Sequence, residues 1–242
     1  MTLPKLFSVV SIAAHQDDIE LSCLGTLIKF QQRGNCRITN ITLTNGDKGS
    51  QHDPRVPYEE VSKIRIAEAD AVAAALGGRH ICLGYPDEYL MVGDEVINKV
   101  VDLLREAQAD LVFAPPLVDY QIDHTAASSI AYQAVMLAGV KTIFTDHDPL
   151  EKYPTLYYMD SITGMEFQPT VYVDITPVFE RKIEVLQLHK SQMKNMEQSG
   201  WDLVKYARIV NAFRGIQCGV EYAEGFRPCL GWPRVQPGCP LP

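Results

Sequence analysis

Two short polar clusters hold the residue types that bind catalytic metals. The first is His15-Gln16-Asp17-Asp18, and the second runs from Asp119 to His124 as Asp-Tyr-Gln-Ile-Asp-His. A catalytic zinc takes three nitrogen or oxygen ligands from the protein and keeps a fourth position for water. Two histidines and one aspartate from these clusters would complete such a set. The residue types therefore predict a zinc site made of His15, His124 and one carboxylate of the first cluster.

The two adjacent aspartates of the first cluster can divide the work of such a site. Neighbouring side chains cannot point at one ion in the same way, so one carboxylate would bind the metal while the other accepts a proton from the attacking water. The spacing leaves open which of Asp17 and Asp18 has which role. Asp123, adjacent to His124 in the second cluster, could orient an imidazole ring through a hydrogen bond.

Each cluster also has a purely structural interpretation. Aspartate favours the N-cap of a helix, and a lone His-x-Asp-Asp segment is more often a capping loop than a metal site. The Asp123-His124 pair is even less specific by itself. A metal site therefore depends on whether the fold brings both clusters to one place.

The predicted elements around the two clusters would bring them together. Apolar runs predict strands at 6–14, 37–44, 80–83 and 111–114, and helical spacing predicts helices at 20–33, 58–76, 95–108 and 125–138. Strands that alternate with helices predict an α/β fold, with a Rossmann-like, doubly wound, mostly parallel sheet flanked by helices. Functional groups in such sheets gather at the carboxyl ends of the strands. His15 and His124 each follow a strand, so both should face one crevice.

The pattern changes after residue 150. Strands are predicted at 155–159 and 170–174, and a helix at 177–194. The tail 221–242 contains five prolines, at 228, 233, 237, 240 and 242, so we expect it to be extended and irregular, in contact with a pocket or with another copy of the chain. There is no internal repeat and no linker-like segment. We expect residues 1–242 to form a single domain.

The composition limits the class of protein. With 46% hydrophobic and 21% charged residues, the 242-residue chain is typical of a globular protein, and its net charge of −8 argues against a nucleic-acid partner. No run approaches the ~18 apolar residues of a membrane span, and the apolar run at 6–14 indicates a buried strand rather than a signal peptide. The 6 cysteines form no Cys-x-x-Cys pair. We expect a cytoplasmic protein with reduced thiols.

The segment Ala14-His15-Gln16-Asp17-Asp18-Ile19-Glu20, followed by Gly25-Thr26, resembles the Ala-His-Pro-Asp-Asp signature of the LmbE-like, or PIG-L, deacetylase family. Six further segments resemble blocks of that family in the same order along the chain. They are Thr44-Asn45-Gly46-Asp47-Lys48-Gly49-Ser50, Ile64-Arg65 with Glu68-Ala69, Asp123-His124, Val173-Asp174-Ile175-Thr176, His189-Lys190-Ser191-Gln192 and Tyr222-Ala223-Glu224-Gly225-Phe226.

The resemblance implies a function. Members of the family are zinc-dependent hydrolases that remove an acetyl group from N-acetylglucosamine-type amines, with a zinc-bound water as nucleophile. It implies His15, Asp18 and His124 as ligands of one zinc (Zn2+) per chain, or of another divalent metal such as Fe2+. It implies Asp17 as general base and Arg65 as a residue that binds substrate or holds Asp17. An amino-sugar substrate and a homo-oligomer, of which the family suggests a hexamer, are further expectations.

The chain departs from the family pattern at two positions. Gln16 replaces the usual proline, which should alter the stiffness of the loop more than the chemistry. Gln121 stands where many members have histidine. Glutamine can donate an N–H group to the oxyanion but cannot supply a proton near neutral pH. Either Asp17 itself or another residue, such as His189, would then protonate the leaving amine.

Polar residues outside the two clusters have weaker support. His189 lies on a predicted amphipathic helix, where a substrate ligand and a packed structural histidine are equally open. Asp87 and Tyr89 follow the third predicted strand. Although they could line a pocket, we expect them to pack their loop.

Three functions follow from these patterns. The first is a zinc-dependent N-deacetylase or related amidase. The second, motivated by Gln121, is a non-catalytic or weakly active sugar-binding relative. The third is a nucleotide-dependent Rossmann enzyme, which is disfavoured because no Gly-x-Gly-x-x-Gly follows the first strand.

Overall fold

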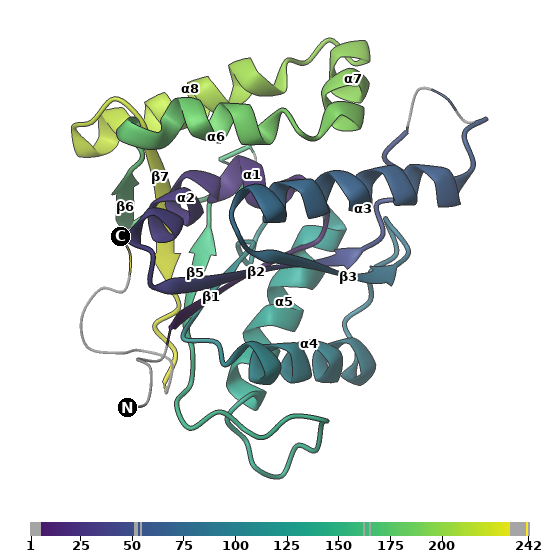
Figure 1. Cartoon of the computed structure of the whole chain (residues 1–242), viewed down its shortest axis with the longest axis vertical. Coiled ribbons are helices and arrows are strands. Elements are labelled where there is room, and N and C mark those ends of the chain that lie inside the picture. The colour runs from purple at the N-terminus through teal and green to yellow at the C-terminus, as the bar shows by residue number, and fades with distance from the viewer. Residues whose placement is uncertain are drawn as a thin grey trace.

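The structure of this protein is a computed structural model that describes residues 6–50, 53, 55–161, 163–164, 166–232 and 241. Its described strands form one sheet (Figure 1). They are β1 (Phe7–Ala13), β2 (Cys36–Thr44), β3 (Arg79–Tyr85), β4 (Leu111–Ala114), β5 (Thr155–Met159), β6 (Val171–Asp174) and β7 (Ala223–Pro228). The helices are α1 (Asp18–Ser22), α2 (Leu24–Arg33), α3 (Tyr58–Ala75), α4 (Asp94–Ala107), α5 (Ile122–Leu137), α6 (Phe179–Leu186), α7 (Lys190–Gln198) and α8 (Leu203–Cys218), with a 3-10 turn η1 (Thr176–Val178) before α6.

The strand order is β3-β2-β1-β4-β5-β7-β6, and β1 to β5 run parallel to one another. Strand β7 is antiparallel to both β5 and β6. The order reverses at β1, from which the chain moves first to β2 and β3 and later to β4 and β5. The predicted α/β fold, a doubly wound and mostly parallel sheet flanked by helices, is confirmed.

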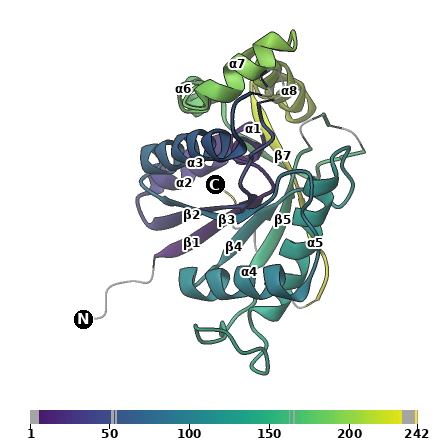
Figure 2. The ribbon, with the colours of Figure 1, turned by 90° about the vertical axis from the view of Figure 1, so that its right-hand side faces the viewer.

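Helices cover both faces of the sheet, and each face has its own apolar core. Figure 2 shows α4 and α5 on one face and α2, α3 and the α6–α8 layer on the other. Alternate residues of β1 serve the two cores: Val9 and Ala13 pack with α2 and α6, whereas Val10 and Ile12 pack with α4 and α5. Because both faces are covered, the central strands are continuous apolar runs rather than alternating ones.

Two predicted helices are interrupted. The helix expected at 20–33 breaks at Cys23, which has φ −144° and ψ 9° and separates α1 from α2. The helix expected at 177–194 begins with η1 and breaks after α6, so that α7 starts only at Lys190. Helical spacing of apolar residues continues across both breaks, and this is why periodicity alone did not reveal them.

Helix α8 was not predicted at all. Its sequence exposes the apolar side chains of Ile209, Phe213 and Ile216 and buries the polar side chains of Asn211 and Arg214. This pattern is the reverse of an ordinary amphipathic helix, so the hydrophobic pattern gave no signal.

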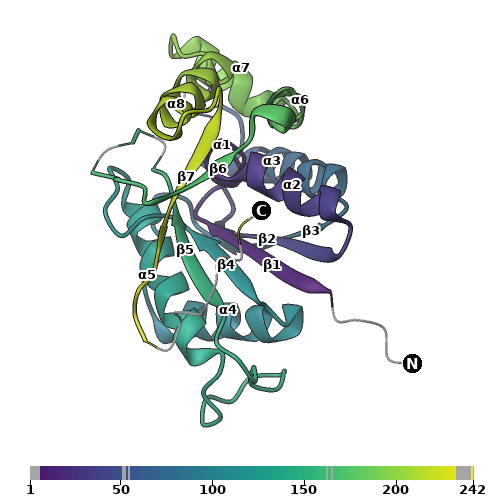
Figure 3. The same cartoon turned by 90° about the vertical axis from the view of Figure 1, so that its left-hand side faces the viewer.

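The expectation of an irregular tail was wrong for its first part. Residues Ala223–Pro228 form strand β7, which lies between β5 and β6 beside α8 (Figure 3). Glu224, Gly225 and Pro228 are residue types that strands usually avoid, so the segment did not resemble a strand. The prolines at 233, 237, 240 and 242 lie outside the described residues. None of the described helices has the length and apolar character that a membrane crossing requires.

Candidate metal centre

The two polar clusters meet at the carboxyl ends of neighbouring strands. Strand β1 pairs with β4, and the chain leaves each strand at the same edge of the sheet. His15 follows β1, Asp18 is the first residue of α1, and His124 lies in the first turn of α5. All three side chains are buried, with 9%, 4% and 4% of their surface exposed. The fold therefore brings the three side chains together at a place that is largely shielded from solvent.

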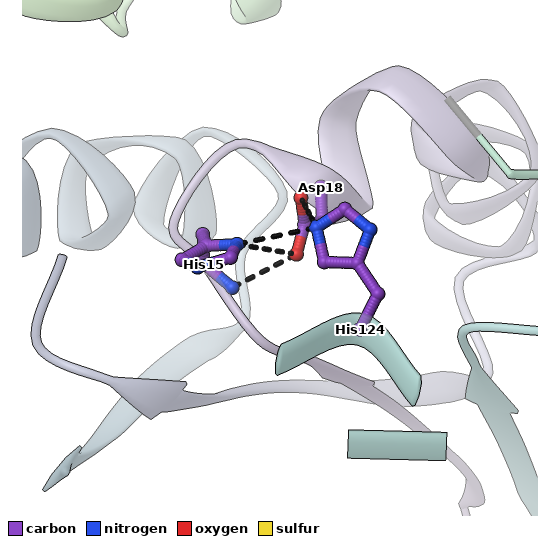
Figure 4. A group of neighbouring side chains, drawn as sticks. All are labelled: His15, Asp18 and His124. Carbon is purple, nitrogen blue, oxygen red and sulfur yellow. Dashed lines mark hydrogen bonds and ion pairs between the residues drawn. The ribbon is translucent and has the colours of Figure 1, made fainter. Parts of the chain in front are cut away.

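Their metal-binding atoms converge on one point (Figure 4). His15 Nδ1 lies 3.2 Å from His124 Nε2, and the Asp18 carboxylate lies 3.5 Å from His15 Nδ1 and 3.3 Å from His124 Nε2. Ligands held at ~2.0–2.2 Å from a tetrahedral zinc lie ~3.3 Å apart, so the spacing of these atoms fits a zinc-sized ion. They form a group that could hold a metal ion.

The other nitrogen of each imidazole faces a second carboxylate. His15 Nε2 lies 2.8 Å from Asp87 Oδ1, and His124 Nδ1 lies 3.0 Å from Asp119 Oδ1. Ring nitrogens that do not bind the metal are commonly held this way in metal sites, which fixes the direction of the ring. The expectation that Asp87 only packs its loop was wrong. Its position directly after the third parallel strand was the signal that could have identified it.

Asp123 faces an imidazole as predicted, but the ring is that of His15 rather than that of its neighbour His124, and Asp123 also holds a loop in place. Its carboxylate accepts hydrogen bonds from the backbone N–H groups of Glu88 at 2.7 Å and Leu90 at 3.1 Å. It therefore ties the loop that carries Asp87 to the start of α5. It also lies 3.6 Å from His15 Nε2, whereas the carboxylate next to the His124 ring is that of Asp119.

His15, Asp87 and Asp123 form a second group with metal-ligand spacing. The oxygens of this group already accept hydrogen bonds: Asp87 from the backbone N–H of Lys48, and Asp123 from two backbone N–H groups. Because these oxygens are engaged and His15 offers them only its outer nitrogen, we interpret the group as the support of the His15 ring.

The charged side chains of this centre shift one another's pKa values strongly. Burial alone would lower the pKa of His124, but the Asp18 charge and the hydrogen bond to Asp119 outweigh it and raise that pKa to about 10. The pKa of His15 is raised well above its usual value against the same opposing burial. Burial would raise the pKa of Asp18, yet the two imidazoles hold it well below its usual range. Without a metal, the charge of Asp18 therefore favours protonation of the His124 ring at neutral pH.

Asp17 occupies the N-cap position of α1, but its side chain makes no capping hydrogen bond. Its Oδ1 instead lies 2.9 Å from Nη2 of Arg65, a buried arginine of α3. The same guanidinium contacts the carbonyl oxygen of Gly46 at 3.4 Å. A side chain at Gly46 or Gly49 would collide with Arg65, so the two glycines make room for it. Arg65 thereby fixes the direction of the Asp17 carboxylate beside the metal centre.

Gln121 is the N-cap residue of α5. Its side-chain oxygen accepts a hydrogen bond from the backbone N–H of His124 at 3.1 Å. The backbone N–H of Gln121 donates to Asp119 Oδ1. The cap uses the oxygen of the amide, so the amide nitrogen remains the end of the side chain that can donate to a substrate.

Gln16 and His189 are both buried. Gln16 Nε2 donates to the carbonyl oxygen of Thr44 at 2.8 Å, which pins the loop after β1 to the end of β2 where the family has a proline. His189, at the N-cap of α7, is 0% exposed and lies 3.4 Å from Glu20 through Nε2. Among the described residues, no hydrogen bond or ion pair joins it to His15, Asp18 or His124.

The fold and the centre define a doubly wound α/β protein with a buried His-Asp-His cluster at the switch point of its sheet. A family model described as PIG-L, GlcNAc-PI de-N-acetylase, matches residues 10–135. That span is more than half of the chain and contains His15, Asp18 and His124. The chain belongs to this family.

Similar proteins include enzymes named for two different reactions, deacetylation and hydration. The chain is 28% identical to a diacetylchitobiose deacetylase from Thermococcus kodakarensis over 90% of its own length and 82% of the relative. It is 24% identical to a 4-oxalmesaconate hydratase from Pseudomonas putida over 97% of its length and 93% of the relative. The structure of an N,N'-diacetylchitobiose deacetylase from Pyrococcus horikoshii superimposes with a TM-score of 0.81 at 26% identity, covering 92% of this chain and 83% of that one.

Proposed function

We propose that the protein is a zinc-dependent hydrolase that removes an N-acetyl or other N-acyl group from an amino sugar or its conjugate. The observation that carries the proposal is the convergence of His15, Asp18 and His124 at metal-ligand spacing, beside the Asp17 carboxylate held by Arg65. The similarity to a diacetylchitobiose deacetylase over most of the chain supports the same reaction.

The residues of the centre divide the steps of amide hydrolysis. A zinc ion held by His15, Asp18 and His124 would supply a Lewis acid that acidifies water and polarises the amide carbonyl. Asp17 accepts a proton from the attacking water as the new C–O bond forms. The amide nitrogen of Gln121 donates to the oxyanion, a contribution of roughly 3–4 kcal/mol for a good donor in other enzymes. Asp17 then returns the proton to the amine as the C–N bond breaks.

A second candidate is the addition of water to a carbon–carbon double bond. The hydratase relative aligns with 97% of the chain, and hydration has no leaving amine, so it does not need the proton that Gln121 cannot supply. The charges of the centre favour amide hydrolysis instead. The two cations beside its carboxylates, Arg65 and Lys48, already pair with Asp17 and Asp47, so neither is left for a carboxylated substrate.

One set of assays separates the candidates. We expect about one zinc per chain by metal analysis, and release of a free amine from N-acetylglucosamine or its oligomers that stops after chelation and returns with zinc. Amine release that is undiminished in metal-free protein would refute the proposal. Water addition to 4-oxalmesaconate without amine release would establish the hydratase. Sugar binding with neither reaction would identify a non-catalytic relative.

A further inference from the structure

The break between α1 and α2 leaves helix ends that need partners. Helix α1 has only 5 residues, and its last carbonyl groups lack the N–H partners that a continuous helix would provide. The first N–H groups of α2 likewise have no partner within the helix. Cys23 stands between the two helices and makes no capping hydrogen bond through its side chain. The missing partners must come from elsewhere in the fold.

Glu224 of β7 supplies the partners for α2. Its Oε1 accepts the N–H of Gly25 at 2.8 Å, and its Oε2 accepts the N–H and the hydroxyl of Thr26 at 2.7 and 2.6 Å. Gly25 and Thr26 are the second and third residues of α2, the positions whose N–H groups an N-cap side chain normally satisfies. The cap therefore comes from a residue 199 positions further along the chain.

Lys182 of α6 supplies the partner for α1. Its Nζ donates to the carbonyl oxygen of Leu21 at 3.0 Å and to Glu224 Oε1 at 2.8 Å. Both charged side chains are 0% exposed. The cation faces the negative end of α1 and the anion faces the positive end of α2, so each charge also meets a favourable helix dipole.

Stability alone does not explain a buried ion pair at this place. Such a pair loses its hydration, and apolar residues of similar volume often stabilise a fold as well or better. What Lys182 and Glu224 determine is the direction of α1 relative to α2. Helix α1 begins with Asp18 and is preceded by Asp17, while α2 is fixed against the core, where Gly25 approaches Ile175 too closely for any side chain.

We propose that Lys182 and Glu224 are positioning residues for the metal centre. By holding the break at Cys23, the pair sets the direction of α1 and so aims the Asp18 carboxylate at the point where His15 and His124 converge. This inference rests on the proposed metal site, but it does not depend on which substrate the site acts upon.

Zinc affinity, measured by competition with a chelator, tests the role of the pair. Glu224→Gln keeps the size of the side chain and removes its charge, and Lys182→Met keeps the aliphatic stem. We expect each variant to bind zinc about tenfold more weakly, the lower end of the effect seen when groups that orient metal ligands are changed. Amide exchange at Gly25 and Thr26 should become faster in both variants.

Arg105→Met is the matched control. Arg105 of α4 is a buried cation, and its side-chain hydrogen bonds go to the carboxyl end of α5 and the loop after it, with none to α1 or α2 in the described structure. This variant should lose thermal stability while its zinc affinity stays within about twofold of the wild type. Zinc affinity unchanged in Glu224→Gln and Lys182→Met, with a loss of stability like that of the control, would overturn the proposal.

A measurement on the unaltered protein covers the case in which the variants do not fold. Zinc binding should slow amide exchange at Gly25 and Thr26 as well as along α1, because the two helices are coupled through the pair. Slowing confined to the residues next to the metal ligands would overturn the proposal. None of these readouts uses a substrate, so failure to release an amine would refute the proposed function alone.

Discussion

Each histidine of the metal centre uses both of its ring nitrogens. His15 turns Nδ1 toward Asp18 and Nε2 toward Asp87, whereas His124 turns Nε2 toward the centre and Nδ1 toward Asp119. The carboxylate at the outer nitrogen accepts a hydrogen bond from the ring N–H. The inner nitrogen then keeps the lone pair that a metal requires.

The residue that orients His124 should control zinc affinity. Asp119→Asn removes the charge that holds the outer N–H, so we expect zinc to bind about 10- to 100-fold more weakly in a chelator competition. Asp102→Asn is the control, because Asp102 holds the ring of His147 in a similar way at 3.0 Å outside the metal centre. Equal affinities in the two variants would contradict the role of Asp119.

Asp17 should be required for turnover but not for the metal. Asp17→Asn removes the general base, and we expect the rate of amine release to fall by about 10²- to 10⁴-fold. The zinc content should stay at the wild-type level because Asp17 pairs with Arg65 and is not among the converging ligands. Asp53→Asn changes an exposed acidic residue that pairs with Arg55 in the described structure, and it should leave both quantities unchanged. Loss of zinc from the Asp17 variant would contradict this division of roles.

The residue types in the sequence were enough to identify the candidate metal ligands, but not the carboxylates that orient them. His15 and His124 stand in short motifs that follow strand ends, so the sequence was sufficient to predict that they meet. The choice of Asp18 over Asp17 came from the family resemblance. The carboxylates that hold their rings could not be assigned in this way. Asp87 and Asp119 reach the rings only through the paths of two irregular loops, and no sequence period describes such paths.

At the scale of elements, a single arginine organises the end of α5. Arg105 of α4 is 1% exposed and donates to backbone oxygens of Leu137, Ala138 and Val140 at the carboxyl end of that helix. It also reaches the oxygens of Ile143 and His147 in the following loop. A cation in this place satisfies carbonyl groups that the helix leaves without partners, and it meets the negative end of the helix dipole.

Removing this arginine should destabilise the fold. Arg105→Met leaves several buried carbonyl groups without donors, and we expect the free energy of unfolding to fall by roughly 3 kcal/mol. Urea denaturation of the metal-free protein measures the change. Arg181→Met serves as the control, because Arg181 is half exposed and, among the residues that the structure describes, pairs with Glu184 on the same helix. A change below about 1 kcal/mol for Arg105→Met would show that the loop does not depend on it.

The elements that the sequence predicted well are those with one dominant burial pattern. The boundaries of strands β1 to β5 and helices α3 to α5 agree with the prediction to within a few residues. The breaks at Cys23 and before Lys190, helix α8 and strand β7 depend instead on distant partners. Glu224 and Lys182 illustrate this, because the caps they form join residues that no local pattern connects.

At the scale of the whole molecule, the charges of the centre couple folding to pH. The pKa of His124 is about 10 in the folded metal-free protein, against about 6.5 in an unfolded chain, and the pKa of His15 is raised as well. The stability contributed by the protonated His124 ring is complete below pH ~6.5 and is lost as the pH rises through about 10, and the raised pKa of His15 acts in the same direction. Asp18 has a lowered pKa, so its contribution is lost only in acid.

Metal-free protein should therefore become less stable between pH 7 and pH 10, as measured by urea denaturation in the presence of a chelator. Zinc affinity should rise over the same interval, because fewer protons have to be displaced from the rings. His124→Gln removes one of the titrating groups and should flatten both profiles. A stability of the wild type that stays constant from pH 7 to pH 10 would contradict the assigned protonation.

The place of β7 has a consequence for the order in which a newly made chain can mature. Strand β6 pairs only with β7 in the described sheet, and β7 also carries the glutamate that caps α2. A ribosome that has reached residue 220 has already produced His15, Asp18 and His124, yet the nascent polypeptide still lacks both the partner of β6 and that cap. Competence to retain zinc should therefore arise only after residues 223–228 have left the exit tunnel.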